Sequence, residues 1–343
     1  MNVAVVGATG YGSAELIRIL ERHPHVTLTQ LVSSSQPGEH LGNIFPHLSH
    51  LSFELDEIDL DALAEAADAV FFAAPAGVSS RLLPPLAERG LICIDLAGDF
   101  RLSGDTYQEW YGASPPPEPW LSQAAYGLSE WFPSSIRKAD VIANPGCYPT
   151  AALMALAPLV QEGVLDEGTV IVDGKSGFSG AGRGVKQTSL FCEVNENAYP
   201  YKVGQHRHTP EMEQVASTLG NRKQSVLFTP QIVPMSRGIL VTLYGRAGDG
   251  WSTSRLRELA EETYRDSYFV RVRGEGRWPR TKEVQGSNFC DISYEWDERT
   301  HTVIGIAAID NLVKGAAGQA VQNLNLRMGW PETAGLEMPP QYP

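Results

Sequence analysis

A cysteine at residue 147 has the setting of a catalytic nucleophile. It lies in NPGCYPTAALMALAPLV (144–160), between a Pro-Gly turn and an apolar run. Pro149 suits the first turn of a helix, so Cys147 is predicted at or just before a helix N-terminus. The partial positive charge and the free amides there stabilise a thiolate, which is the nucleophilic form. The alternative is a small apolar filler of the core, which fits Cys93 and Cys290 well.

Two histidines could serve such a nucleophile. The stretch QHRHTPEMEQV places His206, His208 and Glu211 at the beginning of another predicted helix. A cysteine nucleophile commonly uses a histidine that is distant in sequence but adjacent in the fold. A metal pair is the alternative, but no second cluster supplies further ligands at convincing spacing, so no metal site is predicted.

A glycine turn near the N-terminus points to a nucleotide. Gly7, Gly10 and Gly12 lie in VAVVGATGYGSAEL, between a predicted strand and a predicted helix. Such a turn lets backbone N–H groups and the helix N-terminus approach a pyrophosphate. The spacing differs from G-x-G-x-x-G, and a tight turn without a ligand is the alternative.

The end of the second predicted strand indicates which dinucleotide binds. An acidic residue is expected there for NAD, where it would bind the ribose. The chain instead has Ser33, Ser34 and Ser35. Hydroxyls and loop amides can accept a 2′-phosphate that a carboxylate would repel, so NADP(H) is the predicted cofactor.

The elements that must position these residues fall into two groups. Up to about residue 145, strands alternate with helices, beginning with a strand at 2–7, a helix at 13–22 and a strand at 26–34. This order predicts an α/β fold with a Rossmann-type, doubly wound parallel sheet. Beyond residue 146 strands dominate, which predicts a second α+β domain with a mixed or antiparallel sheet. A final helix is predicted to stop at Gly329.

Composition and charge limit the possible partners. The 343 residues include 27 basic and 40 acidic side chains, for a formal net charge of -13. This balance disfavours binding to nucleic acid or to an anionic membrane, and an anionic substrate would need a local basic pocket. The four cysteines lie far apart, so no disulfide framework is predicted. With no signal-peptide pattern, a cytoplasmic location is expected.

Taken together, these motifs resemble the N-acetyl-γ-glutamyl-phosphate reductases, within the wider group of aspartate-semialdehyde dehydrogenases. The matching stretches are VGATGYGSAEL, FFAAPAGVS, DLAGDFRL, YGLSE, ANPGCYPT, KSGFSGAGR, NENAYPYKVGQHRHTPE and DNLVKGAAGQAVQNLN. They cover nearly the whole chain. One departure is Ser13, which stands where the family usually has a glycine.

The resemblance implies an NADPH-dependent reduction of an acyl phosphate to an aldehyde in arginine biosynthesis. Cys147 would form a thioester, which accepts hydride far more readily than a carboxylate does. His208 is the first candidate for the acid/base and His206 the second, with Glu211 beside them. The resemblance also implies a small anionic substrate and a homodimer or homotetramer.

Further site residues follow from the matched motifs. Besides the three glycines and three serines named above, the expected cofactor-binding residues are Thr9, Tyr11, Ser13, Pro75, Gly177 and Asn311. The expected substrate-binding residues are Arg101, Asn144, Lys175, Arg183 and Lys202, for which surface salt bridging is the alternative. The expected domains are residues 1–145, with a C-terminal helix in 312–343 returning to them, and residues 146–311 for catalysis and dimerisation.

Two other functions compete with this hypothesis. The nearest is another acyl-phosphate or semialdehyde dehydrogenase, acting on an aspartyl or a carrier-linked aminoadipyl phosphate with the same cysteine step. A different class is a non-catalytic NADP-binding sensor, against which the intact NPGCYPT and HRHTPE stretches argue.

Overall fold

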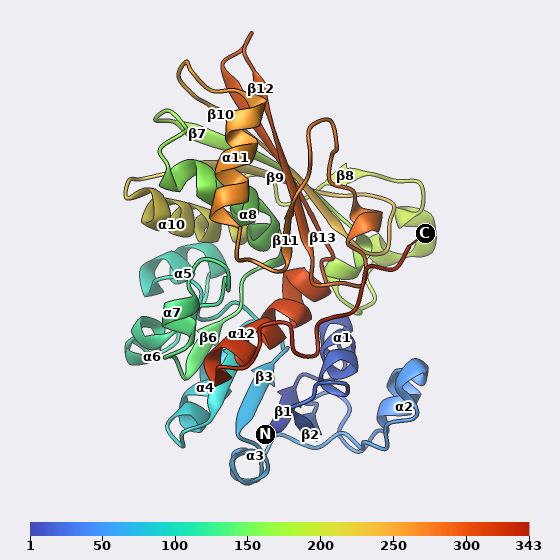
Figure 1. The fold of residues 1–343 in the computed structure, drawn as a ribbon. Coiled ribbons are helices and arrows are strands. Elements are labelled where there is room, and N and C mark those ends of the chain that lie inside the picture. Colours follow the sequence, from blue (N-terminus) through green and yellow to red (C-terminus); the bar gives the residue numbers. More distant parts are fainter. Residues whose placement is uncertain (343) are drawn as a thin grey trace. The chain divides into compact units, whose positions relative to one another are not determined.

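A parallel six-stranded sheet is the centre of the first of two units in the computed structural model, which describes residues 1–342 (Figure 1). Unit 1 comprises Met1–Pro145 and Ala316–Glu337. Its strand order is β2-β1-β3-β4-β6-β5, with every neighbouring pair parallel. The strands are β1 (Asn2–Val6), β2 (Thr27–Val32), β3 (Ala69–Phe72), β4 (Ile92–Asp95), β5 (Ala125–Tyr126) and β6 (Val141–Ala143).

Helices connect these strands. They are α1 (Tyr11–Leu20), α2 (Leu41–Ile44), α3 (Leu60–Ala66), α4 (Ser79–Ala87), α5 (Gly104–Tyr111), α6 (Glu118–Gln123) and α7 (Pro133–Ile136), with a 3₁₀ turn at Pro46–Leu48. Helix α12 (Gly318–Met328), red in Figure 1, returns to this unit and packs beside α1. It ends at Gly329, which has the left-handed φ of +68°.

Burial on both faces explains the parallel sheet. The strands β3 and β4 are completely buried, as expected for a sheet covered by helices on each side. One apolar cluster joins the sheet to α3 and α4, and it includes Val70, Phe72, Leu63 and Leu83. Helix α1 begins at Tyr11, two residues before its predicted start, because Gly10 occupies the N-cap position.

Unit 2 comprises Gly146–Gly315 and the segment from Met338 onwards, and it contains a mixed seven-stranded sheet. The strand order is β11-β12-β13-β10-β7-β9-β8, with β11·β12 and β7·β9 parallel and the other pairs antiparallel. The strands are β7 (Thr169–Ser176), β8 (Tyr199–Pro200), β9 (Ser225–Ile232), β10 (Ile239–Arg246), β11 (Val270–Val272), β12 (Cys290–Asp297) and β13 (Thr302–Ile309).

Helices α8 (Cys147–Gln161), α10 (His208–Gly220) and α11 (Thr253–Thr263) cover one face of this sheet. The unit also contains the short helix α9 (Phe191–Val194), 3₁₀ turns at Phe178–Ala181, Gln187–Ser189 and Thr281–Glu283, and the start of a π-helical segment at Val313–Ala317. Every residue of α8 from Tyr148 to Val160 is buried, because the helix lies between the sheet and α10. The opposite sheet face leaves Ile171, Leu227 and Tyr244 exposed.

The predicted fold class is confirmed in both halves. Strict strand–helix alternation produced the parallel sheet, and the strand-rich half forms the mixed sheet. Among the residues that the structure describes, no helix combines the length and the apolar character needed to cross a membrane.

Candidate functional site

Cys147 is the first residue of α8. Gly146 is the N-cap residue, and as a glycine it has no side chain to cap this helix. Cys147 is partly exposed, whereas Cys93 and Cys290 are buried in strands and Cys192 is exposed. Burial raises the pKa of the Cys93 thiol above its ordinary value. The thiol at residue 147 therefore has both solvent access and a helix N-terminus, which favour the nucleophilic form.

The first turn of α10 packs against the beginning of α8. The buried carboxylate of Glu211 accepts a hydrogen bond from the Gly146 N–H, with a distance of 2.8 Å. The His208 imidazole lies directly against Gly146: a Cβ added to this glycine would overlap Nε2 and come within 2.7 Å of Cδ2. Only glycine at residue 146 allows this approach, so the backbone beside the thiol is fixed by two side chains one helical turn apart.

His206 has a different environment from His208. It is buried among aromatic rings, with its ring centroid 5.8 Å from that of Tyr148 and 5.5 Å from that of Tyr201. Its Nδ1 accepts a hydrogen bond from the His208 N–H at 3.2 Å. Burial, together with the positive charges of Lys202 and Arg207, lowers the pKa of His206 to about 4. His206 is consequently neutral near pH 7 and fixes the backbone at the start of α10.

Tyr148 contributes a buried wall to this site. Its hydroxyl donates to the Gln231 carbonyl at 3.1 Å, and its ring lies 6.1 Å from that of His208. A Cβ on Gly174 of β7 would come within 2.7 Å of the Tyr148 ring. Burial and the neighbouring Tyr201 raise the pKa of Tyr148, so this phenol stays protonated and acts as a donor.

In unit 1 the glycine turn lies where the strand order reverses, between β1 and β3. Ligands of open α/β sheets bind at this point, beyond the carboxyl ends of the strands. Gly7 has a φ of +90°, and a Cβ there would come within 2.7 Å of the Ala73 carbonyl oxygen. The glycine is therefore required by the close approach of the two strand ends.

The rest of the turn is open at the N-terminus of α1. A Cβ on Gly12 would meet no atom within 4 Å, and no acidic residue lies in the first helical turn. Tyr11 is exposed, and Thr9 and Gly10 are partly exposed. Open space beside uncapped amide groups fits a pyrophosphate. Ser13 is completely buried, and its hydroxyl donates to the Gly7 carbonyl at 2.6 Å, so this departure from the family pattern stabilises the turn.

The three serines after β2 are not equivalent. Ser33 is buried, and its hydroxyl accepts from the N–H groups of Ser35 and Gln36 at 3.3 and 3.2 Å. Ser34 and Ser35 are exposed at the tip of this turn. Ser33 therefore shapes the loop, and the two exposed hydroxyls are the ones accessible to a ligand.

The loop after β3, which contains Pro75, is held by a carboxylate that the sequence did not single out. Buried Asp99 accepts hydrogen bonds from the N–H groups of Gly77 and Ser80, at 2.7 and 3.1 Å, and from the Tyr107 hydroxyl at 2.9 Å. Pro75 itself is exposed. The matched stretch DLAGDFRL contains Asp99, but the groups that donate to its carboxylate are brought there by tertiary contacts.

Two expected substrate ligands are bonded within unit 1. Arg101 is buried and donates from Nε to the Asn144 carbonyl at 2.7 Å and from Nη2 to the Leu96 carbonyl at 3.0 Å. The buried Asn144 amide donates to the Ala316 carbonyl and accepts from Asn323, at 3.1 and 3.0 Å. Both side chains thereby hold strand ends in place.

The expected cations of unit 2 have separate locations. Lys175 lies on the sheet face opposite α8, where it forms an ion pair with Asp173 at 2.8 Å. Arg183 is exposed in the loop after β7. Lys202 is also exposed, with a left-handed φ of +46°, and its charge acts on His206. The positive charge of Lys202 thus links it to the histidines.

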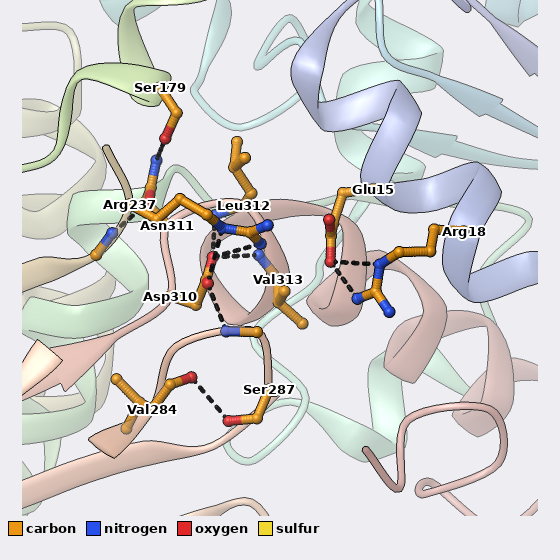
Figure 2. A network of polar contacts seen from close by, with 12 residues as sticks. Glu15, Arg18, Ser179, Arg237, Val284, Ser287, Asp310, Asn311, Leu312 and Val313 are labelled. Atoms are coloured by element: carbon orange, nitrogen blue, oxygen red, sulfur yellow. Dashed lines mark hydrogen bonds and ion pairs between the residues drawn. The ribbon is translucent and has the colours of Figure 1, made fainter. Parts of the chain in front are cut away.

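The remaining expected cofactor residues, Gly177 and Asn311, contact the loop between β9 and β10. A Cβ on Gly177 would lie 2.8 Å from the Arg237 nitrogen. The Asn311 amide accepts from the Gly238 N–H at 2.7 Å and donates to the Ser179 hydroxyl at 2.9 Å (Figure 2). Among the residues described, no group of three or more His, Cys, Asp or Glu side chains could hold a metal ion.

Sequence comparisons identify two domain matches and several full-length relatives. Residues 2–139 match the semialdehyde dehydrogenase NAD binding domain, and residues 147–311 match the semialdehyde dehydrogenase dimerisation domain. The N-acetyl-gamma-glutamyl-phosphate reductases of Geobacillus sp. (strain WCH70) and of Brevibacillus brevis are each 50% identical over 345 residues, covering 100% of both chains.

Solved structures share the fold at low sequence identity. Aspartate semialdehyde dehydrogenase II from Vibrio cholerae aligns with a TM-score of 0.74 at 18% identity, covering 96% of this chain and 98% of that one. Aspartate semialdehyde dehydrogenase with NADP from Candida albicans aligns with a TM-score of 0.68 at 15% identity, covering 95% and 97%. At these identities the likeness concerns the fold.

Proposed function

Because the chain belongs to the family of N-acetyl-γ-glutamyl-phosphate reductases, we propose that it reduces N-acetyl-γ-glutamyl phosphate to N-acetylglutamate semialdehyde and releases phosphate, a step of arginine biosynthesis. The observation that supports this reaction most directly is the placement of Cys147 at the start of α8, beside the Gly146 backbone that His208 and Glu211 hold.

In the first half of the reaction, the Cys147 sulfur attacks the acyl carbon. The carbon–oxygen bond to phosphate breaks, and a thioester remains on the enzyme. His208 takes the thiol proton at its imidazole and passes it to the departing phosphate. The amides at the N-terminus of α8 stabilise the thiolate that forms between these transfers.

In the second half, the thioester carbon is reduced. A nicotinamide cofactor, when bound, supplies the hydride. The resulting thiohemiacetal oxyanion re-forms its carbonyl as the carbon–sulfur bond breaks, which gives the aldehyde and the Cys147 thiolate. A proton from solvent then restores the thiol, with His208 as its route. Neutral His206 keeps the first turn of α10 in position.

The cofactor has a fitting place in unit 1. The Gly10–Gly12 segment leaves open space at the N-terminus of α1, and the loop that Asp99 holds follows the adjacent strand β3. We expect NADPH to be preferred over NADH, because Ser34 and Ser35 are exposed where an NAD enzyme would have a carboxylate.

Steady-state kinetics with both cofactors test that preference. The kcat/KM with NADPH is expected to exceed that with NADH. Ser34→Asp should raise the KM for NADPH while leaving NADH kinetics nearly unchanged, because a carboxylate repels the 2′-phosphate. Ser34→Ala is the matched control without the charge. A higher kcat/KM with NADH in the unaltered protein would contradict the assignment.

The substrate is tested in the oxidative direction. Purified protein with phosphate and NADP⁺ is expected to oxidise N-acetylglutamate semialdehyde far faster than aspartate semialdehyde. The reverse preference would assign the chain to the aspartyl type of dehydrogenase. Cofactor binding by fluorescence titration, without turnover of either aldehyde, would instead support the sensor hypothesis.

An assembly of identical chains is part of this proposal, because the chain contains the family's dimerisation domain. The sheet face opposite α8 leaves Leu227, Ile171 and Tyr244 exposed on the neighbouring strands β9, β7 and β10, beside the Lys175–Asp173 ion pair. Exposed apolar side chains on adjacent strands are suited to pairing with a second copy. We assign this face to the interface of a homodimer, on which a homotetramer could be built. Sedimentation velocity measures the oligomeric state.

A further inference from the structure

A buried carboxylate after β13 connects several segments of unit 2. Asp310 is completely buried and accepts hydrogen bonds from Arg237 Nε and Nη2 at 3.0 and 3.1 Å. It also accepts from the backbone N–H groups of Gly286, Leu312 and Val313 at 2.7, 2.9 and 3.1 Å. Figure 2 shows these bonds converging on the one side chain. The carboxylate thus fixes the start of the π-helical segment Val313–Ala317.

That segment lies against the candidate nucleophile. The Gly315 N–H donates to the Asp310 carbonyl at 3.0 Å, so the same residue binds the segment through both its side chain and its backbone. A Cβ on Gly315 would lie 2.9 Å from Cys147 Cβ and 3.3 Å from Cys147 Cα. The backbone at residue 315 therefore packs directly against Cys147, and it can do so only because this residue is glycine.

Other residues in and beside the π-helical segment are also held in place. Lys314 is completely buried, and its ammonium lies 5.7 Å from the centroid of the Phe269 ring. Asn311, directly after Asp310, binds Gly238 and Ser179. Short π-helical insertions occur frequently at functional sites. A π-helical turn, a buried carboxylate and a close glycine contact thus coincide beside one reactive side chain.

We propose that Asp310 is a positioning residue for the thiol: it holds the π-helical segment so that Gly315 packs on Cys147 and keeps the sulfur aimed at the acyl carbon. The inference rests on the proposed function, because it takes Cys147 as the nucleophile. A displacement of a reacting group by about 1 Å costs roughly 10²-fold in rate, so small movements of the π-helical segment should have large kinetic effects.

Asp310→Asn tests this role, with Asp291→Asn as the matched control. Asp291 is also a completely buried carboxylate of unit 2, and it forms ion pairs with Arg271 at 2.5 Å and with Arg273 at 3.8 Å. Both changes remove one charge from a buried acid–arginine pair. We expect Asp310→Asn to lower kcat by about 10²-fold with little change in KM. Asp291→Asn should leave kcat within a few-fold of the unaltered value at a similar loss of thermal stability.

A readout without turnover separates this inference from the proposed function. The rate of iodoacetamide alkylation of Cys147, measured in a Cys192→Ser background, should change several-fold in Asp310→Asn and stay constant in Asp291→Asn. The two inferences fail differently: a preference for aspartate semialdehyde over N-acetylglutamate semialdehyde would overturn the proposed function, and a fully active Cys147→Ser enzyme would disprove its thioester mechanism. Equal kcat and alkylation rates in the two carboxylate variants would overturn the positioning role of Asp310.

If Asp310→Asn does not fold, a pair of glycine variants tests the same proposal. Gly315→Ala should disturb the thiol directly. Gly305→Ala introduces a methyl group at the same distance, 2.9 Å, from Leu243 Cδ1 and serves as the control. We expect slower turnover and altered alkylation of Cys147 only in Gly315→Ala. Identical behaviour of the two variants in both assays would refute the proposal.

Discussion

Replacing Cys147 by serine is expected to abolish the reduction of the acyl phosphate while leaving cofactor binding intact. A serine at the start of α8 keeps a polar side chain of similar size, but its hydroxyl stays protonated near neutral pH and cannot form a labile thioester. Loss of a nucleophile typically lowers kcat by roughly 10⁴-fold or more. Turnover assays measure the loss, and fluorescence titration with NADPH reports the retained binding.

The covalent intermediate provides an independent check. Mass spectrometry of protein mixed with acyl phosphate in the absence of NADPH should show an acyl adduct on the Cys147 peptide. Because Cys192 is exposed, iodoacetamide will reach it as well, and Cys192→Ser is the appropriate background for alkylation. Buried Cys93, with its raised pKa, should react slowly. An adduct on a different residue, or an active Cys147→Ser protein, would disprove the mechanism but not the fold.

Replacing His208 by asparagine is expected to lower kcat by roughly 10² to 10⁴, the usual contribution of general acid–base catalysis. The imidazole lies against Gly146, directly before the thiol, so its loss removes the proton carrier from the site. The KM for the acyl phosphate should change much less than kcat.

His206→Asn is the control for this assignment. With its pKa lowered to about 4, His206 is a neutral imidazole at pH 7 and not the imidazolium that a general acid needs, and its loss should affect stability more than chemistry. The folded-state pKa lies below the ordinary value of 6.5, so the neutral ring favours folding above that pH. This contribution diminishes as pH falls from 6.5 towards 4. A far larger loss of kcat in His206→Asn than in His208→Asn would reverse the two roles.

Local sequence determined the elements and the chemistry at their ends. Strand–helix alternation up to residue 145 predicted the parallel sheet. The sequence could show this alternation because the hydrophobic periodicity of a helix or a strand depends on residues only a few positions apart. Pro149 predicted that Cys147 lies at a helix N-terminus, and α8 begins at that residue. The glycines after β1 predicted a tight turn, and Gly7 has the positive φ that requires glycine.

Tertiary structure decided which side chains face the thiol and which are used internally. Arg101 and Asn144, expected from the motifs as substrate ligands, also donate to the backbone carbonyls of Leu96 and Ala316. Every residue type carries a backbone carbonyl, so such a partner leaves no mark in the sequence. The same holds for Glu211, whose carboxylate meets the Gly146 N–H across 65 residues of chain.

The contacts around Cys147 show the same division between sequence and structure. Gly146 and Gly315 are two of 33 glycines in the chain, and although both lie in the matched stretches ANPGCYPT and DNLVKGAAGQAVQNLN, those stretches do not reveal which side chains pack against them. Their importance arises because His208 and Cys147, each distant in sequence, pack where a Cβ would be. The sequence by itself determined that a thiol would start a helix. Only packing between distant segments decided how that thiol is held, because such contacts depend on the fold as a whole.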